Sequence, residues 1–455
     1  MFSKDFIWGA ATAAYQIEGA VHEAGRGESI WDRFSHTPGK VHNDETGDVA
    51  CDHYHRYPED IALIKQLGVR SYRFSMAWSR IFPTGKGDIN AAGLAFYDRL
   101  IDNILAADLL PNLTLYHWDL PQALEDAGGW LNRDTAQCFT DYADVVARHF
   151  GDRISLWATF NEPLCSAFHG YTWGVHAPGH IDPTFRSAAH AIHHIYLAHG
   201  QAVSVIRQHT PPDTQVGIVL NVSPAYPASD SEADRAATRR GDGVGNRWFL
   251  DPLFKGTYPA DVLDLLGSDA QPPIQDGDMA IISTPLDFLG VNYYFRSVVQ
   301  DDPTSDGIAK NRSIMPAGAT RTDMGWEIYP DGLRDILIRV AKDYQPKALY
   351  VTENGSAMRD ILEADGSVHD ARRVAYLRDH LRAVQEAIEA GAPVKGYYAW
   401  SLLDNFEWAY GYEKRFGLIY VDYATQKRYL KDSFYYYQSV IQAKTDVVEK
   451  STDRT

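Results

Sequence analysis

Short apolar runs alternate along the chain with longer segments that have a helical repeat of apolar positions. The runs begin near residues 6, 69, 111, 155, 215, 287, 347 and 394. Between them, the spacing of apolar residues predicts helices over 57–68, 90–107, 134–150, 185–208, 331–344 and 370–390, with a last helix from 432. Apolar strands that alternate with helices form a parallel sheet, and eight such units close on themselves. The pattern therefore predicts an α/β fold, the (β/α)8 or TIM barrel.

No linker or internal repeat interrupts these units. We therefore expect residues 1–455 to form a single domain with long loops after the strands, since α/β barrels of this length are known. Residues 299–325 are the longest polar stretch and are expected to form such a loop. The polar tail over 445–455 is expected to fray.

Two of the strands end in a glutamate. The run that starts at Ser155 leads into Asn161 and Glu162, and the run that starts at Ala348 leads into Glu353. In a barrel, both carboxyl groups would lie at the mouth formed by the carboxyl ends of the strands, where barrel enzymes have their active sites. A pair of carboxyl groups is what cleavage of a glycosidic bond requires. Each glutamate taken alone could equally be an ordinary surface residue.

The other strand ends carry neutral polar groups and aromatic rings. On a period of two, Arg73 lies on the inner face of its strand, where it would need a carboxylate partner. The remaining side chains expected at the mouth are Gln16, His117, Trp118, Asn161, Asn292, Tyr294, Trp400, Glu407 and Trp408. Amides and carboxylates bind hydroxyl groups, and flat rings cover the C–H face of a sugar. The sequence thus favours a neutral sugar as the substrate.

Charge and composition exclude several other classes of function. The chain has 455 residues and a formal net charge of −17, which disfavours nucleic acid and anionic membranes as partners. The three cysteines lack metal-site spacing, and the N-terminus lacks the apolar core of a signal peptide, so we expect a cytoplasmic protein. No run of apolar residues is long enough to cross a bilayer.

We expect no cofactor and no metal. The histidines of the segment 185–208 have helical spacing but are surrounded by alanine and isoleucine, which favours a structural role; they are His190, His193, His194 and His199. The glycines of 241–245 follow a helical segment rather than a strand, so they do not fit a phosphate-binding loop.

Several intact motifs resemble family 1 glycoside hydrolases, the retaining β-glucosidases. They are Thr-Phe-Asn161-Glu162-Pro, Val-Thr-Glu353-Asn-Gly, the N-terminal stretch from Phe6 to Gly19 that contains Gln16, Asn292-Tyr-Tyr294, Asn246-Arg-Trp-Phe-Leu-Asp-Pro and the stretch from Trp400 to Trp408. The resemblance covers essentially the whole chain. It implies hydrolysis of terminal β-D-glucosyl residues through a glycosyl-enzyme, with cellobiose, short cello-oligosaccharides and aryl β-glucosides as substrates and β-galactosides and β-fucosides as further candidates.

The resemblance also assigns roles to residues. Glu353 is expected to be the nucleophile and Glu162 the general acid/base, while Asn161 would bind the sugar's 2-hydroxyl group. Arg73 and Tyr294 would stabilise the charge of the nucleophile. Gln16, His117, Trp118, Trp400, Glu407 and Trp408 would line the pocket for the glucosyl unit, and Trp326 would form a wall for the leaving group.

One departure and three alternatives accompany this interpretation. Many relatives have tryptophan directly after Asn-Glu-Pro and an apolar residue five positions later, where this chain has Leu164 and His169. This departure affects the leaving-group side.

A 6-phospho-β-glycosidase would have small and basic residues in place of Glu407 and Trp408, and a thioglucosidase would have glutamine in place of Glu162. A non-catalytic glycan-binding barrel would be expected to have lost one of the two glutamates.

Overall fold

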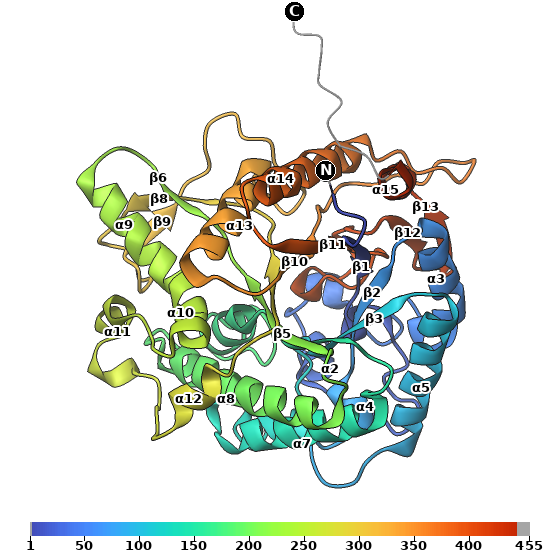
Figure 1. The fold of residues 1–455 in the computed structure, drawn as a ribbon, viewed down its shortest axis with the longest axis horizontal. Helices are drawn as coiled ribbons and strands as arrows, with labels where there is room; N and C mark the ends of the chain where they lie inside the picture. Colours follow the sequence, from blue (N-terminus) through green and yellow to red (C-terminus); the bar gives the residue numbers. More distant parts are fainter. Residues whose placement is uncertain (1, 444–455) are drawn as a thin grey trace, which may run out of the picture.

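Eight parallel strands close into a barrel at the centre of the computed structural model, which describes residues 2–443 (Figure 1). They are β1 (Ile7–Ala11), β2 (Ser71–Ser75), β3 (Leu110–Tyr116), β4 (Leu156–Asn161), β5 (Gln215–Asn221), β7 (Phe288–Asn292), β10 (Leu349–Asn354) and β11 (Val394–Trp400). The barrel closes because β1 pairs in parallel with both β2 and β11. The predicted (β/α)8 barrel is confirmed, whereas the single-domain organisation stays a prediction.

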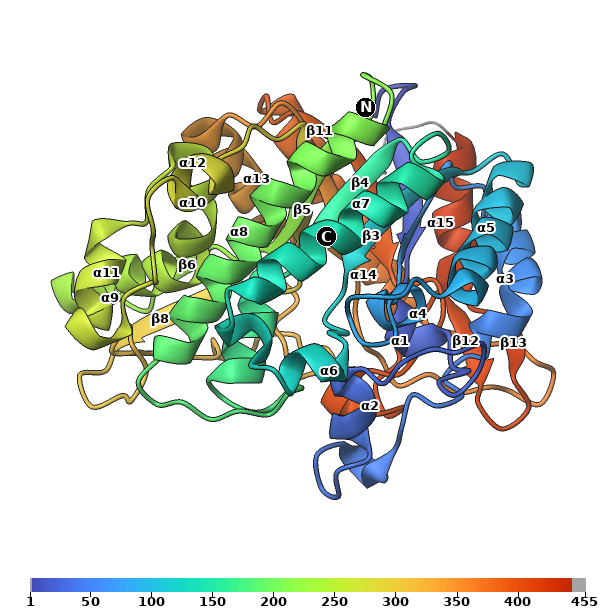
Figure 2. The same cartoon turned by 90° about the horizontal axis from the view of Figure 1, so that it is seen from below.

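Helices surround the barrel and connect successive strands. The main ones are α3 (His53–Leu67), α5 (Ala91–Ala106), α7 (Asp134–Phe150), α8 (Arg186–His209), α13 (Pro330–Tyr344), α14 (Ala371–Glu389) and α15 (Asp432–Ala443). In Figure 2, α7 and α8 pack side by side across the outside of β4 and β5. The frayed tail predicted for 445–455 lies outside the described residues.

The start of α3 differs from the prediction. The helix begins at His53 rather than at Tyr57, and Pro58 lies inside it. The earlier start accompanies a buried hydrogen bond between His53 Nδ1 and Asp60, which are 2.7 Å apart. Gly68 ends α3 as predicted, with a left-handed φ of 82° that glycine adopts without strain.

The polar stretch 299–325 is also more ordered than predicted. It contributes to a small sheet of β6 (Ala225–Pro227), β8 (Ser297–Asp301) and β9 (Asn311–Ser313), which lies beside the barrel next to α9 (Glu232–Asp242) (Figure 1). The central strand of this sheet pairs with a segment some 70 residues earlier in the chain, so local periodicity could not reveal it. Residues Gly243–Arg247 form one turn of π-helix that continues α9, and the glycines there belong to no strand–loop–helix unit.

Two apolar clusters hold the architecture together. The larger lies between the strands and the surrounding helices, and the smaller fills the inside of the barrel with Leu156, Phe288, Tyr350 and Tyr398 among others. Tyr398 crosses directly over Gly9, where any side chain would overlap its ring. The barrel interior is therefore a packed floor beneath the mouth. No helix among residues 2–443 is both long enough and apolar enough to cross a bilayer.

Candidate active site

Two buried glutamates stand at the carboxyl-end mouth of the barrel. Glu162 directly follows β4, and Glu353 is the last residue but one of β10. In the order of the barrel, β5 and β7 lie between these two strands. The exposed fraction is 5% for Glu162 and 3% for Glu353. The folded chain thus brings to one mouth the two carboxyl groups that the sequence singles out.

Both oxygens of Glu353 accept short hydrogen bonds from fixed donors. Arg73 Nη1 lies 2.6 Å from Oε1, and the hydroxyl of Tyr294 lies 2.6 Å from Oε2. Arg73 points inward from β2, so it has the carboxylate partner that its position requires. The guanidinium cation and the phenol together fix the orientation of this carboxyl group.

Glu162 lies in a different environment. Asn292 donates from Nδ2 to its Oε1 at 2.6 Å, and the thiol of Cys165 donates to its Oε2 at 3.1 Å. Burial, followed by the negative charge of Glu353, raises the pKa of Glu162 to about 7. The two carboxyl groups at one mouth therefore have different surroundings: a cation is bonded directly to Glu353, and none is bonded to Glu162.

A chain of hydrogen bonds connects the two glutamates. Arg73 donates from Nη2 to Asn161 Oδ1 at 2.7 Å, and Asn292 Nδ2 donates to the same oxygen at 3.1 Å. Thr352 in turn donates to Asn292 Oδ1 at 2.7 Å. Four side chains from four strands thus fix the orientation of the amides between the carboxyl groups.

Aromatic rings cluster at the mouth of the barrel next to this pair. The ring centre of His117 lies 5.8 Å from that of Trp400 and 6.0 Å from that of Trp408, and Trp118 lies 4.6 Å from Trp408. Burial, with a smaller effect of the Arg73 cation, holds the pKa of His117 well below its usual range. The imidazole is therefore neutral and can both donate and accept.

Gln16 and Glu407 are polar residues that contact each other beside these rings. Gln16 lies in the short helix α1 (Ala14–Ile17), not at a strand end as expected, because β1 already ends at Ala11. Its Nε2 donates to Asn405 Oδ1 at 3.0 Å and contacts Glu407 Oε2 at 3.4 Å. Burial and then the charge of Glu353 raise the pKa of Glu407 to about 8.

Three residues of the mouth have left-handed backbone conformations. The φ angles are 77° for Trp118, 47° for Glu162 and 51° for Trp408. Such conformations are costly for residues other than glycine and persist where the surrounding structure enforces them. Here they coincide with one glutamate and two of the pocket rings.

Comparison with known proteins gives the chain its family. The protein-family model described as "Glycosyl hydrolase family 1" matches residues 1–446. The chain belongs to glycosyl hydrolase family 1.

Relatives in this family match the chain over nearly its full length. A protein named "Beta-glucosidase A" from Acetivibrio thermocellus is 48% identical over 442 residues, which are 97% of this chain and 98% of that protein. A "Bifunctional beta-D-glucosidase/beta-D-fucosidase" from Bifidobacterium breve is 45% identical over 463 residues, or 97% and 98% of the two chains. The solved structure of the Thermotoga maritima β-glucosidase with deoxynojirimycin has a TM-score of 0.94 and 47% identity, and covers 97% of this chain and 98% of that one.

Trp326, which the sequence predicts as a wall for the leaving group, lies next to Tyr294. Its ring lies 5.3 Å from Tyr294 and 6.1 Å from Phe416, and it is only half-buried. It therefore borders the residue that contacts Glu353. The departures at Leu164 and His169 both follow β4: Leu164 packs against the core, and the ring of His169 lies 5.2 Å from the exposed Trp173. Burial lowers the pKa of His169 to about 4, so its ring is neutral.

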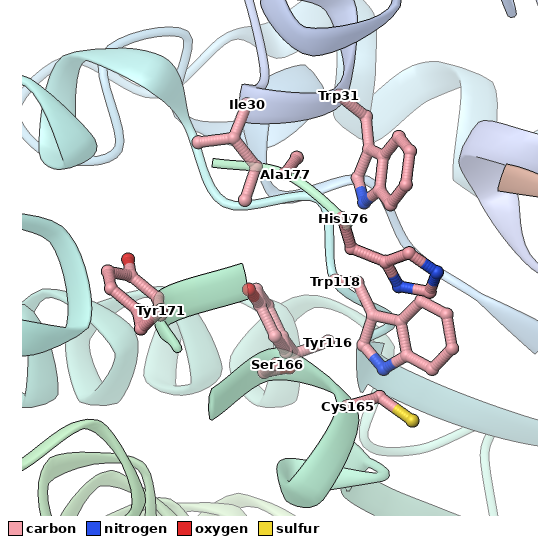
Figure 3. A pocket seen from close by; sticks show the side chains of 9 residues that line it. All are labelled: Ile30, Trp31, Tyr116, Trp118, Cys165, Ser166, Tyr171, His176 and Ala177. Carbon is pink, nitrogen blue, oxygen red and sulfur yellow. The ribbon is translucent and has the colours of Figure 1, made fainter. Parts of the chain in front are cut away.

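A cavity of about 10 Å³ lies next to the aromatic rings of the mouth (Figure 3). The side chains that line it include Trp31, Trp118, His176, Cys165 and Ser166 (Figure 3). The volume is about that which one water molecule needs. The cavity backs onto both a pocket tryptophan and the thiol that contacts Glu162.

Three residues near the glutamates are not predicted from the sequence. Cys165 contacts Glu162, Thr352 orients Asn292, and Asn405 receives the amide of Gln16. Thr352 immediately precedes Glu353 and Asn405 lies two residues before Glu407, so proximity to predicted site residues was the available signal. For Cys165 the signal is its place three residues after Glu162, in the turn that follows β4.

The histidines of α8 have structural partners. His193 lies 2.8 Å from Asp278, His194 lies 2.9 Å from the carbonyl of Trp130, and His199 lies 2.7 Å from the hydroxyl of Thr159. Within residues 2–443, no group of three or more potential ligands is arranged to hold a metal ion.

A buried ion cluster supports the loop that follows β11. Asp404 accepts from Arg415 at 2.6 Å and from Lys431 at 2.7 Å. Lys431, which is fully buried, also lies 2.5 Å from Asp360, and Asp360 pairs with Arg373 at 2.9 Å. Because buried charges are tolerated only when paired, this cluster fixes the start of the loop that carries Glu407.

Proposed function

We propose that this family 1 enzyme is a retaining β-glucosidase in which Glu353 is the nucleophile and Glu162 the general acid/base. The observation that carries the proposal is the contrast between the two glutamates. Glu353 accepts hydrogen bonds from the Arg73 guanidinium and the Tyr294 hydroxyl, whereas Glu162 has a pKa raised to about 7. A retaining mechanism needs one carboxylate and one carboxylic acid at the same mouth.

In the first step, a carboxylate oxygen of Glu353 attacks the anomeric carbon as the glycosidic bond breaks. The proton of Glu162 passes to the departing oxygen, so the leaving group departs as a neutral alcohol. Glu353 then carries the sugar as an ester, and Glu162 has become a carboxylate.

In the second step, Glu162 accepts a proton from water while the water oxygen bonds to the anomeric carbon. The ester bond breaks and Glu353 leaves as a carboxylate, which Arg73 and Tyr294 stabilise as its charge returns. Two inversions at the same carbon give overall retention.

The pocket residues suit a neutral glucosyl unit. Asn161 lies between the glutamates, where its amide Nδ2 can serve the 2-hydroxyl group, and neutral His117 can donate or accept. Gln16 and Glu407 offer a polar edge for the hydroxyl groups at the far end of the sugar, and Trp118, Trp400 and Trp408 offer flat faces. Trp326 is placed to contact the leaving group.

The names of the relatives support glucosides as substrates. We propose cellobiose, short cello-oligosaccharides and aryl β-glucosides, with β-fucosides next because the Bifidobacterium breve relative is named for both activities. β-Galactosides are a further candidate. The 6-phospho-β-glycosidase alternative is disfavoured by the carboxyl group of Glu407, and a non-catalytic barrel by the presence of both glutamates.

We also propose a cytoplasmic location. Cys51, Cys138 and Cys165 are all free thiols, which fits a reducing compartment. Fractionation of the native organism, with activity measured in each fraction, tests this assignment.

Stereochemistry and rescue by an external anion test the roles of the glutamates. NMR of the first-formed product should show β-glucose. Azide should restore turnover of an activated aryl glucoside to Glu353→Gly with inversion and to Glu162→Ala with retention, because only the second variant can still form the glycosyl-enzyme. The same stereochemical outcome in both variants would refute the assignment.

A further inference from the structure

The hydrogen bonds around Glu162 distinguish its two oxygens. Arg73 can only donate, so the atom of Asn161 that faces it at 2.7 Å must be the carbonyl oxygen. Asn292 lies 3.1 Å from that same oxygen and must therefore present its amide nitrogen there. The same nitrogen lies 2.6 Å from Glu162 Oε1. Oε1 is thus fixed as the acceptor of an N–H group.

The other oxygen faces a thiol. Cys165 Sγ lies 3.1 Å from Oε2, and both residues are buried, with exposed fractions of 7% and 5%. The amide nitrogen of Asn221 lies 3.7 Å from the same sulfur and donates to it. With its lone pair engaged by Asn221, the thiol has its own proton available for Oε2.

We propose that the transferable proton of Glu162 resides on Oε2 and that Cys165 is a positioning residue that donates its S–H to this oxygen whenever the oxygen is ionised. The inference rests on the proposed role of Glu162 as acid/base and adds to it a residue that acts only through that carboxyl group. The thiol favours the ionised form and holds the carboxylate in one orientation.

The cycle balances without any change in the thiol. In the first step the Oε2 proton goes to the departing oxygen, and the new carboxylate accepts the S–H hydrogen bond. In the second step a proton from water returns to Oε2 as the water oxygen bonds to the sugar. Cys165 keeps its proton throughout, because burial and the charge of Glu162 hold the pKa of the thiol well above its usual range.

Other groups also face Glu162 and remain constant in the test. They are Glu353 on β10, Arg73 on β2, Tyr294 after β7 and Glu407 after β11. Removal of the thiol alone therefore reports on one contact against an unchanged background.

The experiment measures kcat/KM against pH for an aryl β-glucoside with a poor leaving group, whose cleavage needs the proton. Cys165→Ala and Cys165→Val, the second close to cysteine in size, both lack a donor. We expect both variants to shift the alkaline limb of the pH profile to higher pH by about half a unit to one unit, because loss of a weak hydrogen bond to a carboxylate raises its pKa. Cys165→Ser, with a stronger donor, should hold the limb at or below its wild-type position.

Ser166→Ala is the matched control. Ser166 is the next residue along the chain, and its side chain lines the small cavity (Figure 3). We expect its limb to stay at the wild-type position. A limb that stays in place in both Cys165→Ala and Cys165→Val, or that moves equally in Ser166→Ala, would overturn the proposal.

A second measurement separates positioning from packing. In the Glu162→Ala background with azide and an activated substrate, adding Cys165→Ala should leave turnover within about twofold, because the carboxyl group through which the thiol acts is gone. A large further loss there would mean that Cys165 only packs. The stereochemistry of the single variants distinguishes failure of this proposal from failure of the proposed function. If the variants retain configuration but the alkaline limb of the pH profile does not move, only the role of Cys165 is refuted. If they invert configuration, the proposed function is refuted.

Discussion

Formation of the glycosyl-enzyme should lower the pKa of Glu162. In the free protein this pKa is about 7, because of burial first and the charge of Glu353 second. A 2-deoxy-2-fluoroglucosyl donor that traps the intermediate converts Glu353 to an ester and removes its charge. Arg73 then faces no carboxylate, and its cation acts more strongly on Glu162.

The size of the effect follows from the expected geometry of a retaining pair. Two charges about 5.5 Å apart interact by about 3 kcal/mol at an effective dielectric of 20, and 1.36 kcal/mol is one pKa unit. We therefore expect the pKa of Glu162 to fall by about 2 units on trapping. The fall suits the proposed mechanism, in which Glu162 donates a proton in the first step and accepts one in the second.

Carbon-13 NMR of protein labelled at the glutamate carboxyl carbons measures this change directly. Titrations of the free and trapped enzyme are compared, and the resonance that disappears in Glu162→Gln is assigned to Glu162. Glu407, with a pKa raised to about 8 partly by the charge of Glu353, should also fall and serves as an internal check.

A change in the pKa of Glu162 smaller than about half a unit would refute the reasoning, because the charge of Glu353 would then be too distant or too well screened to matter. A rise on trapping would contradict it more strongly. Either result would remove the electrostatic basis for the change of role between the two steps.

Two further predictions concern single side chains. Tyr294→Phe removes a hydrogen bond to the Glu353 carboxylate worth about 1.5–3 kcal/mol, so release of the sugar should slow by about 10- to 100-fold in pre-steady-state measurements. The matched control is Tyr293→Phe, which removes a hydroxyl that donates to the carbonyl of Tyr329 instead. An equal loss of rate in this control would contradict the assignment. The ratio of the inhibition constants of glucose 6-phosphate and glucose should grow from pH 7 to pH 9, because Glu407 ionises with a pKa of about 8. The ionised carboxylate repels the phosphate by about 4 kcal/mol at 4 Å, which corresponds to roughly a 10³-fold effect at most. Glu407→Gln should show a ratio that does not grow over this range, and a wild-type ratio that also stays flat would argue against charge as the basis of selectivity.

The sequence predicts the barrel and the two glutamates because both depend on local pattern. Buried parallel strands are short apolar runs, and the carboxyl ends of such strands meet at one mouth, so the positions of Glu162 and Glu353 follow from periodicity. The inward direction of Arg73 follows from the alternation of side chains along a strand.

Features that depend on contacts between distant segments could not be predicted. The place of Gln16 in a short helix, its hydrogen bond to Asn405 and the pairing of β6 with β8 all join segments far apart in the sequence. The contact of Cys165 with Glu162 depends on the left-handed turn at Glu162, a conformation that nothing in the local pattern signals. The raised pKa of Glu407 likewise follows from burial and neighbouring charges.

The hydrogen bonds of Gln16 with Asn405 and Phe406 bring the first and last parts of the barrel together at the sugar pocket. During synthesis, Glu162 and Glu353 leave the ribosome before the strand that closes the barrel and before Lys431, which anchors the loop of Glu407. A nascent chain can thus contain both glutamates and still lack the loop that carries Glu407. We therefore expect hydrolytic activity to begin only after the chain has been synthesised beyond Lys431, when the barrel can close.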